Sequence, residues 1–248
     1  QITMGDYANP IQVSIHQFYG IEINDFAATV AKTALWIAES QMLKETEDII
    51  AHQIDFLPLK SYANITEGLR LNWEDVVPKT KLNYIMGNPP FVGARLMDAS
   101  QKSDVNLIFE GWKNVGNLDY VCCWYKKAAD LMQGTEIRSA LVSTNSVSQG
   151  ESVANLWKPL FEAGVHIDYA YRTFRWDSEA KIKAHVHCVI IGFSIAPNHE
   201  ERILYSGDRA QVVQNINGYL LDAENVFVES RNKPLCNVPE IGIGNKPI

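Results

Sequence analysis

Four consecutive residues of this 248-residue chain, Asn88, Pro89, Pro90 and Phe91, could hold a flat and poorly nucleophilic amine. The lone pair of an amine attached to an aromatic ring is delocalised, and acceptors on its two N–H bonds would localise it. The Asn88 side-chain oxygen is one acceptor, and the Pro89 carbonyl, whose direction Pro90 helps to fix, is the other. Both bonds would strengthen as positive charge develops on nitrogen, and Phe91 offers a ring for stacking. These residues predict methylation of an exocyclic amine such as N6 of adenine.

Two predicted strands present such residues at their carboxyl ends, where open α/β sheets bind ligands. Leu82–Met86 is a mostly apolar run that must stop at the glycine and prolines behind it. Gln17–Ile23 predicts another strand that ends near Glu22, and Asn24 then caps a helix expected to reach about Lys44. The apolar face of that helix is formed by Phe26, Val30, Ile37 and Ala38. A carboxylate after a strand can accept both hydroxyls of a ribose; a helix N-terminal acid is the alternative interpretation of Glu22.

The second half of the chain predicts further strands and helices. Strands are expected at 139–145, 165–171, 184–194, 202–206 and 219–221, and helices at 118–132 and 150–161. Basic and aromatic residues alternate between two of these strands, at Arg172, Phe174, Arg175 and Trp176. This composition predicts phosphate contacts and a second wall for an extruded base. A charged hairpin with one buried aromatic side chain is the alternative.

Four blocks, in order along the chain, resemble the large bacterial restriction–modification methyltransferases of the MmeI and YeeA type. The blocks are Asn88–Gly93; Gly116–Val121 with Trp124 and Tyr125; Ser143–Ser146 with Gln149–Glu151; and Ala184–Phe193. The resemblance runs from about residue 17 to the end of the chain, and ordered blocks are far more specific than Asn-Pro-Pro-Phe alone. It implies an α/β fold, the Rossmann-like sheet with flanking helices of class I S-adenosylmethionine-dependent methyltransferases. It also implies methyl transfer from S-adenosylmethionine to N6 of an adenine flipped out of DNA.

The resemblance also implies roles for single residues. Asn88–Phe91 corresponds to the motif that holds the target amine, and Glu22, with Ile23 beside it, to the acid that binds the cofactor ribose. Asn72 stands where the family usually has an aspartate against the cofactor adenine. Because an amide donates as well as accepts, a surface polar residue is an equally good interpretation of Asn72. Residues 92–106 form a polar segment that would lie near the flipped base or be a solvated connection.

One element that the family leads us to expect is missing. The family places a glycine-rich loop, which cradles the methionine end of the cofactor, before the strand that ends in the ribose-binding acid, and residues 1–16 contain no such loop. We therefore expect a sheet that lacks the first, glycine-loop strand and has an exposed apolar edge beside residues 18–23 and 82–86. Residues 11–15, direct pairing of those strands, or self-association with a second copy could cover it. We expect the chain alone to be catalytically silent and to bind S-adenosylmethionine weakly or not at all.

Composition sets the expected organisation and partners. Residues 1–230 are expected to form a partial methyltransferase domain, and residues 231–248 an extended linker towards a target-recognition domain. The net charge of −7 is the wrong sign for a module that holds DNA by itself, so double-stranded DNA should be bound mainly through that other domain. We expect neither a membrane-spanning stretch nor a signal peptide. The four cysteines lack metal-type spacing, and His185 and His187 lack a third ligand, which indicates free thiols in a bacterial cytoplasm and no metal.

Other functions are compatible with the same residues. The turn would serve any planar amide or exocyclic amine, so a methyltransferase for glutamine side chains or for RNA is one alternative. A non-catalytic DNA-binding or interaction subunit that retains the methyltransferase fold is another. A glycine-rich loop elsewhere in the parent protein would favour an enzyme over a non-catalytic subunit.

Overall fold

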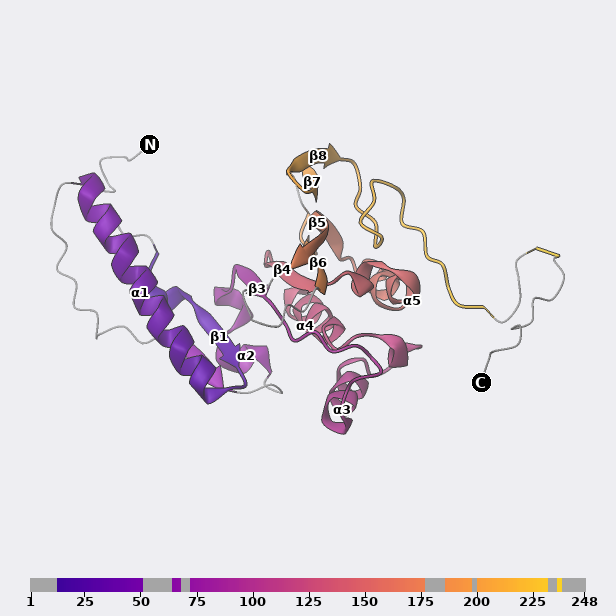
Figure 1. Cartoon of the computed structure of the whole chain (residues 1–248), viewed down its shortest axis with the longest axis horizontal. Coiled ribbons are helices and arrows are strands. Elements are labelled where there is room, and N and C mark those ends of the chain that lie inside the picture. Colours follow the sequence, from indigo (N-terminus) through magenta and orange to yellow (C-terminus); the bar gives the residue numbers. More distant parts are fainter. Residues whose placement is uncertain are drawn as a thin grey trace. The chain divides into compact units, whose positions relative to one another are not determined.

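The computed structural model describes residues 13–50, 64–67, 72–176, 186–197, 200–231 and 236–237. The chain forms two compact units, residues 1–81 (unit 1) and residues 82–248 (unit 2), which Figure 1 shows in colours that follow the sequence. Each unit combines strands with helices, as expected for the α/β class. Most of the expected linker, at 232–235 and 238–248, lies outside the described residues.

Unit 1 is built from a short parallel sheet and one long helix. Its elements are β1 (Tyr19–Glu22), α1 (Asp25–Ile50), β2 (Asn64–Glu67) and α2 (Trp73–Val76), with 3₁₀ helices at Ile15–Gln17 and Lys79–Lys81. β1 and β2 pair in parallel. The Asn24 side chain accepts a hydrogen bond from the Ala27 N–H at 3.0 Å, which confirms the predicted cap of α1. The helix continues to Ile50, beyond its predicted end near Lys44.

The predicted apolar face of α1 is largely uncovered. Phe26 is 74% exposed, Val30 50% and Ile37 54%. Among the described side chains of α1, only Ala28 and Leu43 are buried. A two-stranded sheet offers a helix of this length little surface to pack against. Helical spacing of apolar residues therefore does not report burial in this unit.

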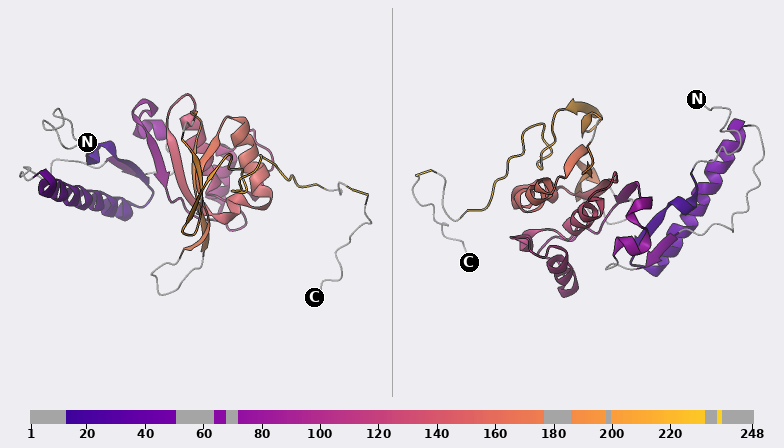
Figure 2. Two further views of the ribbon diagram at one scale, coloured as in Figure 1. Left: turned by 90° about the horizontal axis from the view of Figure 1, so that it is seen from above. Right: turned by 180° about the vertical axis from the view of Figure 1, so that it is seen from behind.

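Unit 2 contains a six-stranded mixed sheet. Its elements are β3 (Tyr84–Gly87), α3 (Ala99–Ile108), α4 (Cys122–Met132), β4 (Arg138–Thr144), α5 (Gly150–Ser152), α6 (Lys158–Glu162), β5 (His166–Trp176), β6 (Val186–Ser194), β7 (Arg202–Ser206) and β8 (Arg209–Val213). The strand order is β3-β4-β6-β5-β7-β8. β3 is parallel to β4 and β5 to β7, whereas the other neighbours are antiparallel. Figure 2 shows the helices of unit 2 beside this sheet.

The core of unit 2 is an aromatic cluster between the sheet and its helices. Tyr125 of α4 stacks on Phe193 of β6 with ring centroids 5.2 Å apart, and Trp157 meets Tyr125 edge-on at 5.4 Å. All three side chains are fully buried. The Tyr125 hydroxyl bonds the Ser143 hydroxyl at 2.7 Å, and the Trp157 Nε1–H donates to the Val147 carbonyl at 2.9 Å. The buried polar atoms of both rings are thus satisfied, as a stable core requires.

A π-helical turn, Val153–Trp157, lies inside the predicted helix 150–161. Gly218 packs directly against this turn. A Cβ at Gly218 would lie 2.8 Å from Val153 Cγ1 and 3.0 Å from Trp157 Cβ. Only glycine permits the backbone at residue 218 to approach these two side chains so closely. The contact packs the C-terminal segment of unit 2 against the central tryptophan of the core.

Three features of unit 2 differ from the sequence prediction. β5 extends to Trp176, so residues 172–176 belong to a strand and not to a connection. α3 overlaps the polar segment 92–106 and begins where Asp98 accepts a hydrogen bond from the Gln101 N–H at 2.8 Å. The sequence does not predict β8, and residues 219–221, expected as a strand, form an irregular turn.

β3 is an edge strand among the described strands, because it pairs only with β4. Its side chains Tyr84 and Met86 are 68% and 76% exposed. This is the exposed apolar edge expected beside residues 82–86. Within unit 1, β1 pairs with β2. Residues 11 and 12 of the expected covering segment lie outside the described residues.

All four cysteines are free: Cys122, Cys123 and Cys188 are buried, and Cys236 is exposed. The described ranges hold no group of three or more His, Cys, Asp or Glu side chains that could bind a metal ion, and His185 lies outside these ranges. None of the helices within them is both long and apolar enough to cross a membrane.

Candidate active site

The Asn-Pro-Pro-Phe turn follows β3 directly, at the carboxyl end of the strand. Pro89 is buried, Phe91 is half-buried, and Asn88 and Pro90 are exposed. Neither the Asn88 amide nor the Pro89 carbonyl bonds to any residue that the structure describes, and none of the described aromatic rings stacks on Phe91. The turn therefore has two hydrogen-bond acceptors that no described residue uses and one half-buried ring, and the buried Pro89 anchors it in unit 2.

Four residues hold the loop that follows this turn, and we call them the loop clamp: Asp119, Tyr120, Thr144 and Ser146. The Tyr120 N–H donates to the Val92 carbonyl at 2.9 Å. The Ala94 N–H donates to Asp119 Oδ1 at 3.2 Å. Two successive residues thus bind two backbone groups of the loop, one through the main chain and one through a side chain.

The Asp119 carboxylate is the centre of the loop clamp. Its Oδ2 accepts a short hydrogen bond from the Ser146 hydroxyl. The Thr144 hydroxyl donates its single proton to the Ser146 oxygen at 2.7 Å and lies 3.4 Å from the same Oδ2. No described cation pairs with this half-buried carboxylate, so hydrogen bonds alone compensate its charge. Hydrogen bonds to a charged acceptor are among the stronger ones in proteins.

Tyr120 also connects α3 to the loop clamp. Its hydroxyl donates to Asp104 Oδ2 at 2.8 Å, and both side chains are buried. Burial lowers the pKa of the nearby Lys127, although Cys123 and Asp104 oppose the shift. Burial, with the charge of Asp104, raises the pKa of Cys123 to about 12. This thiol therefore stays protonated at neutral pH, which excludes it as a nucleophile.

The predicted basic and aromatic residues lie at the carboxyl end of β5, on the same side of the sheet as the carboxyl end of β3 and its turn. Thr144, at the end of β4, lies opposite Cys188, and Cys188 lies opposite Phe174 on β5. β3, β4 and β5 run in one direction, so their carboxyl ends all lie at the same end of the sheet. β4 and β6 separate β3 from β5, which is a lateral distance of about 14 Å at ordinary strand spacing.

The end of β5 presents these residues to solvent. Arg172 and Arg175 are exposed, and Trp176 is 44% exposed. The rings of Phe174 and Trp176 lie 6.2 Å apart in a tilted arrangement. A register shift between Tyr171 and Phe174 marks a bulge, which re-aims the side chains beyond it. Lys181 and Lys183, in the same predicted basic stretch, lie outside the described residues.

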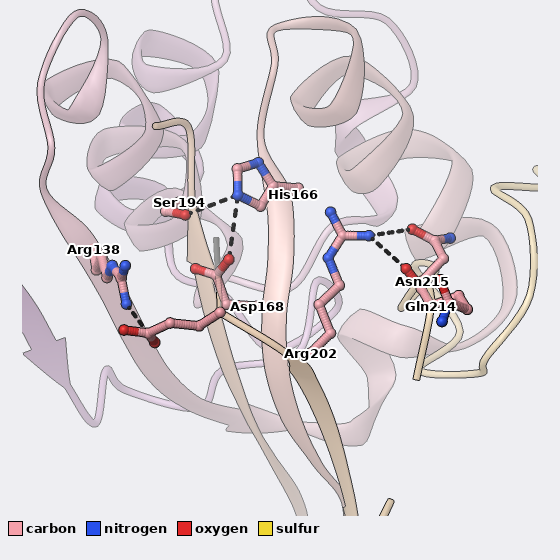
Figure 3. A network of polar contacts seen from close by, with 8 residues as sticks. Arg138, His166, Asp168, Ser194, Arg202, Gln214 and Asn215 are labelled. Carbon is pink, nitrogen blue, oxygen red and sulfur yellow. Dashed lines mark hydrogen bonds and ion pairs between the residues drawn. The ribbon is translucent and has the colours of Figure 1, made fainter. Parts of the chain in front are cut away.

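A polar network lies at the other end of the strands, where β4 and β5 begin and β6 ends (Figure 3). His166 Nε2 lies 3.0 Å from the Ser194 hydroxyl and 3.2 Å from Asp168 Oδ1. Arg138 forms an ion pair with Glu200 at 3.0 Å. Serine and aspartate share one ring nitrogen here, whereas a Ser-His-Asp hydrolase places them on opposite nitrogens. The network joins strand ends and has no hydrolase geometry.

A hollow of about 320 Å³ extends from this network across the sheet. Its lining is rich in tyrosine and acids and includes Tyr84, Tyr171, Tyr205, Glu200 and Glu201. The rings of Tyr171 and Tyr205 stack at 4.2 Å. Arg138 is the single basic residue of the lining, and it is paired with Glu200. An acidic wall repels phosphates, so this hollow is a poor candidate for DNA binding.

The predicted cofactor residues of unit 1 lie at the ends of secondary-structure elements. Glu22 ends β1, is half-buried, and accepts a hydrogen bond from the Asn24 N–H at 3.0 Å. Ile23 is 59% exposed. The Asn72 side chain caps α2 by accepting from the Glu74 N–H at 3.3 Å. Glu22 keeps one oxygen for a ligand, whereas the Asn72 oxygen is already engaged.

Comparison with known proteins decides the family. The family described as MmeI, DNA-methyltransferase domain, matches residues 2–206. The chain belongs to this family. DNA methyltransferase A of Bacillus subtilis (strain 168) is 39% identical over 252 residues, which cover 100% of this chain and 29% of that protein. The Type IIL restriction-modification enzyme MmeI, solved in complex with DNA, matches with a TM-score of 0.87 and 40% identity over 92% of this chain and 32% of its own.

The MmeI-type assignment confirms two expectations from the sequence. One is the resemblance to restriction–modification methyltransferases, and the other is the class I methyltransferase fold. The chain spans about a third of the length of these relatives. Methyltransferases of this class use S-adenosylmethionine, so the family implies this cofactor.

Sequence reasoning missed the loop clamp as a functional feature. Asp119 and Ser146 both lie in blocks that carry the resemblance, but nothing local in either block pairs one with the other. Only the folded sheet brings the end of β4 next to the segment before α4. The one available signal was that Asp119 and Ser146 are polar residues in blocks that resemble the family, and that neither had been given a function.

Proposed function

We propose that this chain supplies the amine-binding part of a DNA methyltransferase that acts on N6 of adenine in double-stranded DNA, within a restriction–modification system. The observation that carries the proposal is the Asn-Pro-Pro-Phe turn at the carboxyl end of β3, with the Asn88 amide and the Pro89 carbonyl bonded to no described residue. Membership in the MmeI methyltransferase family supports the same reaction class.

The turn acts by accepting hydrogen bonds from the amine. Asn88 Oδ1 and the Pro89 carbonyl each take one N–H, so the nitrogen lone pair points away from the ring and towards the methyl donor. Bound S-adenosylmethionine supplies the electrophilic methyl group. As the nitrogen gains positive charge both bonds strengthen, which lowers the barrier more than it stabilises the bound substrate. Phe91 stacks on the adenine ring and holds it in that orientation.

Glu22 is the residue of this chain best suited to the cofactor. Its carboxylate sits at the end of β1 and keeps one oxygen beyond its bond to the Asn24 N–H. It would accept from the ribose hydroxyls, with Ile23 beside the cofactor. Asn72 fits less well, because its oxygen caps α2. An adenine contact through Asn72 would therefore use the amide nitrogen or replace the cap.

The end of β5 is the part of unit 2 best suited to DNA. Arg172 and Arg175 offer charge to phosphates, and Phe174 and Trp176 offer rings to a base. β3 and β5 are separated by about 14 Å at ordinary strand spacing, so a second wall opposite Phe91 would require these side chains to reach across β4 and β6. Contacts with the DNA around the extruded base require no such reach.

Two further expectations belong to the longer protein. With a net charge of −7, DNA affinity comes mainly from residues beyond this chain, such as a target-recognition domain, and the protein acts in the bacterial cytoplasm. The exposed edge of β3 would accept another strand, either from the longer protein or through self-association.

The test is Asn88→Ala in the full-length protein, with the exposed Asn106→Ala of α3 as a matched control. Loss of one transition-state acceptor should lower kcat about 10²–10³-fold, whereas cofactor affinity and the control rate stay unchanged. Methylated nucleosides in the DNA digest are measured directly. A rate for Asn88→Ala equal to that of the control refutes the role. Methyl groups found on glutamine or RNA, and not on adenine, identify one of the other substrates.

A further inference from the structure

The Asn88 turn needs support that its own residues do not provide. It lies on a connection between β3 and α3, and its two acceptors are bonded to no described residue. Catalysis by acceptors requires that they stay within about 0.5 Å of the productive geometry. A misplacement of about 1 Å can cost about 10²-fold in rate. Something in unit 2 must fix the loop that continues from Phe91.

Asp119 meets that need through contacts on both sides. Its Oδ1 accepts from the Ala94 N–H, three residues after Phe91, and its Oδ2 accepts from the hydroxyl of Ser146, just after β4, which Thr144 at the end of β4 in turn hydrogen-bonds. β4 is the strand that pairs in parallel with β3. The turn begins at the end of β3 and continues to Ala94. The Asp119 carboxylate therefore links the Ala94 end of this segment to β4, the strand that pairs with β3.

We propose that Asp119 is a positioning residue for methyl transfer, which holds the base-binding turn through the Ala94 N–H and the Ser146 hydroxyl. This inference rests on the proposed function. Asp119 does not act as a base, because each of its carboxylate oxygens already accepts a hydrogen bond within the clamp. Its role is to keep Asn88, Pro89 and Phe91 in one fixed arrangement, so that their bonds to the amine form without reordering the loop.

The neighbouring contacts of Tyr120 make this role separable from folding. The Tyr120 N–H bonds the Val92 carbonyl, and its hydroxyl bonds the buried Asp104. These contacts do not involve the Asp119 side chain, so unit 2 keeps its connections to the loop and to α3 when that side chain is changed. Removal of the carboxylate should loosen residues 92–94 and leave the core intact.

The experiment compares four variants of the full-length protein. Asp119→Ala removes the carboxylate, Asp119→Asn keeps an oxygen for the Ala94 N–H and an NH2 group for the hydroxyls, and Ser146→Ala removes one link to β4. Asp98→Ala is the matched control, because it too removes a carboxylate that accepts a backbone N–H, at the start of α3. Each variant is assayed for kcat, KM for DNA, cofactor affinity, thermal stability, and fluorescence of 2-aminopurine at the target adenine.

We expect a lower kcat for Asp119→Ala, by about 10–100-fold, with KM and cofactor affinity within about threefold of the wild type. The 2-aminopurine signal should report a base that is flipped but held less tightly. Asp119→Asn should restore kcat to within about fivefold, and Ser146→Ala should lower it by less than Asp119→Ala does. Asp98→Ala should lower thermal stability without a change in kcat.

Other outcomes overturn the proposal. Wild-type kcat in Asp119→Ala does so, and so does equal loss of kcat in Asp119→Ala and Asp98→Ala at equal loss of stability. If Asp119→Ala does not fold, wild-type kcat in Ser146→Ala overturns it instead. The proposed function fails separately, when the wild-type enzyme makes no methyladenine or Asn88→Ala retains full activity. An inactive Asn88→Ala beside a fully active Asp119→Ala removes only the positioning role.

Discussion

Helices α1 and α4 differ in how many of their side chains are buried. α1 has 26 residues, and among its described side chains only Ala28 and Leu43 are buried. α4 has 11 residues and buries Cys122, Cys123, Tyr125, Ala128, Ala129, Leu131 and Met132. Both helices carry apolar residues at helical spacing, but the apolar stripe is much weaker in α1 than in α4. The surface available also differs, a two-stranded sheet in unit 1 and a six-stranded sheet in unit 2.

Because of this difference, the candidate site residues of unit 1 and those of unit 2 have unequal structural support. The base-binding turn and the loop clamp stand on a unit with its own aromatic core. Glu22 stands on a unit whose long helix leaves Phe26 at 74% exposure. The Asn88 turn can therefore be rigid by itself, whereas Glu22 belongs to a unit whose long helix is largely uncovered. The following predictions would break or sharpen this contrast.

The largest effect is expected for the core of unit 2. Trp157→Ala should lower the free energy of unfolding by about 3–5 kcal/mol, because it opens a cavity in a fully buried cluster. Phe26→Ala in α1 should change it by less than about 0.5 kcal/mol. Urea unfolding followed by far-UV circular dichroism compares the two. A large cost for Phe26→Ala would show that its ring is covered in solution and would remove the contrast.

A smaller effect is expected at the cofactor. Glu22→Ala in the full-length protein should raise the Kd for S-adenosylmethionine about 10–100-fold, which corresponds to the loss of hydrogen bonds to a carboxylate. Asn88→Ala and the exposed Glu45→Ala should leave it unchanged. Calorimetric titration measures all three, and also the isolated 248-residue chain, in which we expect weak binding or none. Micromolar binding by the isolated chain would contradict that expectation.

Alkaline pH should destabilise unit 2 through its buried thiols. Burial raises the pKa of Cys122 and Cys123, the latter to about 12, while an unfolded thiol ionises near pH 8.5. Above about pH 8.5 the folded state binds more protons, so stability is full below that pH and falls as pH rises towards about 12. Each thiol should contribute a slope of about 1.4 kcal/mol per pH unit. The slope of the urea midpoint should flatten in a Cys122→Ala/Cys123→Ala variant.

The smallest effects concern two helix caps of the same kind, one in each unit. Asn24→Ala removes the bond to the Ala27 N–H in α1, and Asp98→Ala removes the bond to the Gln101 N–H in α3. Each should cost about 1 kcal/mol. Because tertiary contacts hold α1 weakly, Asn24→Ala should also reduce helicity by circular dichroism before unfolding. Equal retention of helicity in both variants would show that α1 is as well supported as α3.

Strands were predictable where apolar runs are bounded by turn residues. β3 and β4 follow that rule, and their existence was expected from residues 82–86 and 139–145. The end of β5 was not, because residues 172–176 are polar and aromatic on an exposed strand, where no buried face imposes alternation. β8 lies behind Gly207 and Asp208, a hairpin turn signal that the prediction did not use.

Local chemistry was predictable, and its supports were not. The acceptors of the Asn88 turn follow from residue type and order alone. α3 escaped notice although Asp98 and Gln101 form a capping box, because its apolar residues give a weak stripe. The pairing of Asp119 with Ser146 depends on the folded sheet, which places residues far apart in sequence side by side. No periodicity or composition encodes that contact.

The strand that carries the turn finds its partner late in the chain. Tyr84 on β3 pairs with Arg138 on β4, and α3 and α4 lie between them in sequence. Closing so long a connection costs chain entropy before the pairing stabilises it, unlike the local hairpin of β7 and β8. During refolding, the amide protons of β3 should gain protection from exchange after those of β7 and β8. The base-binding turn would then be among the last parts of unit 2 to acquire its shape.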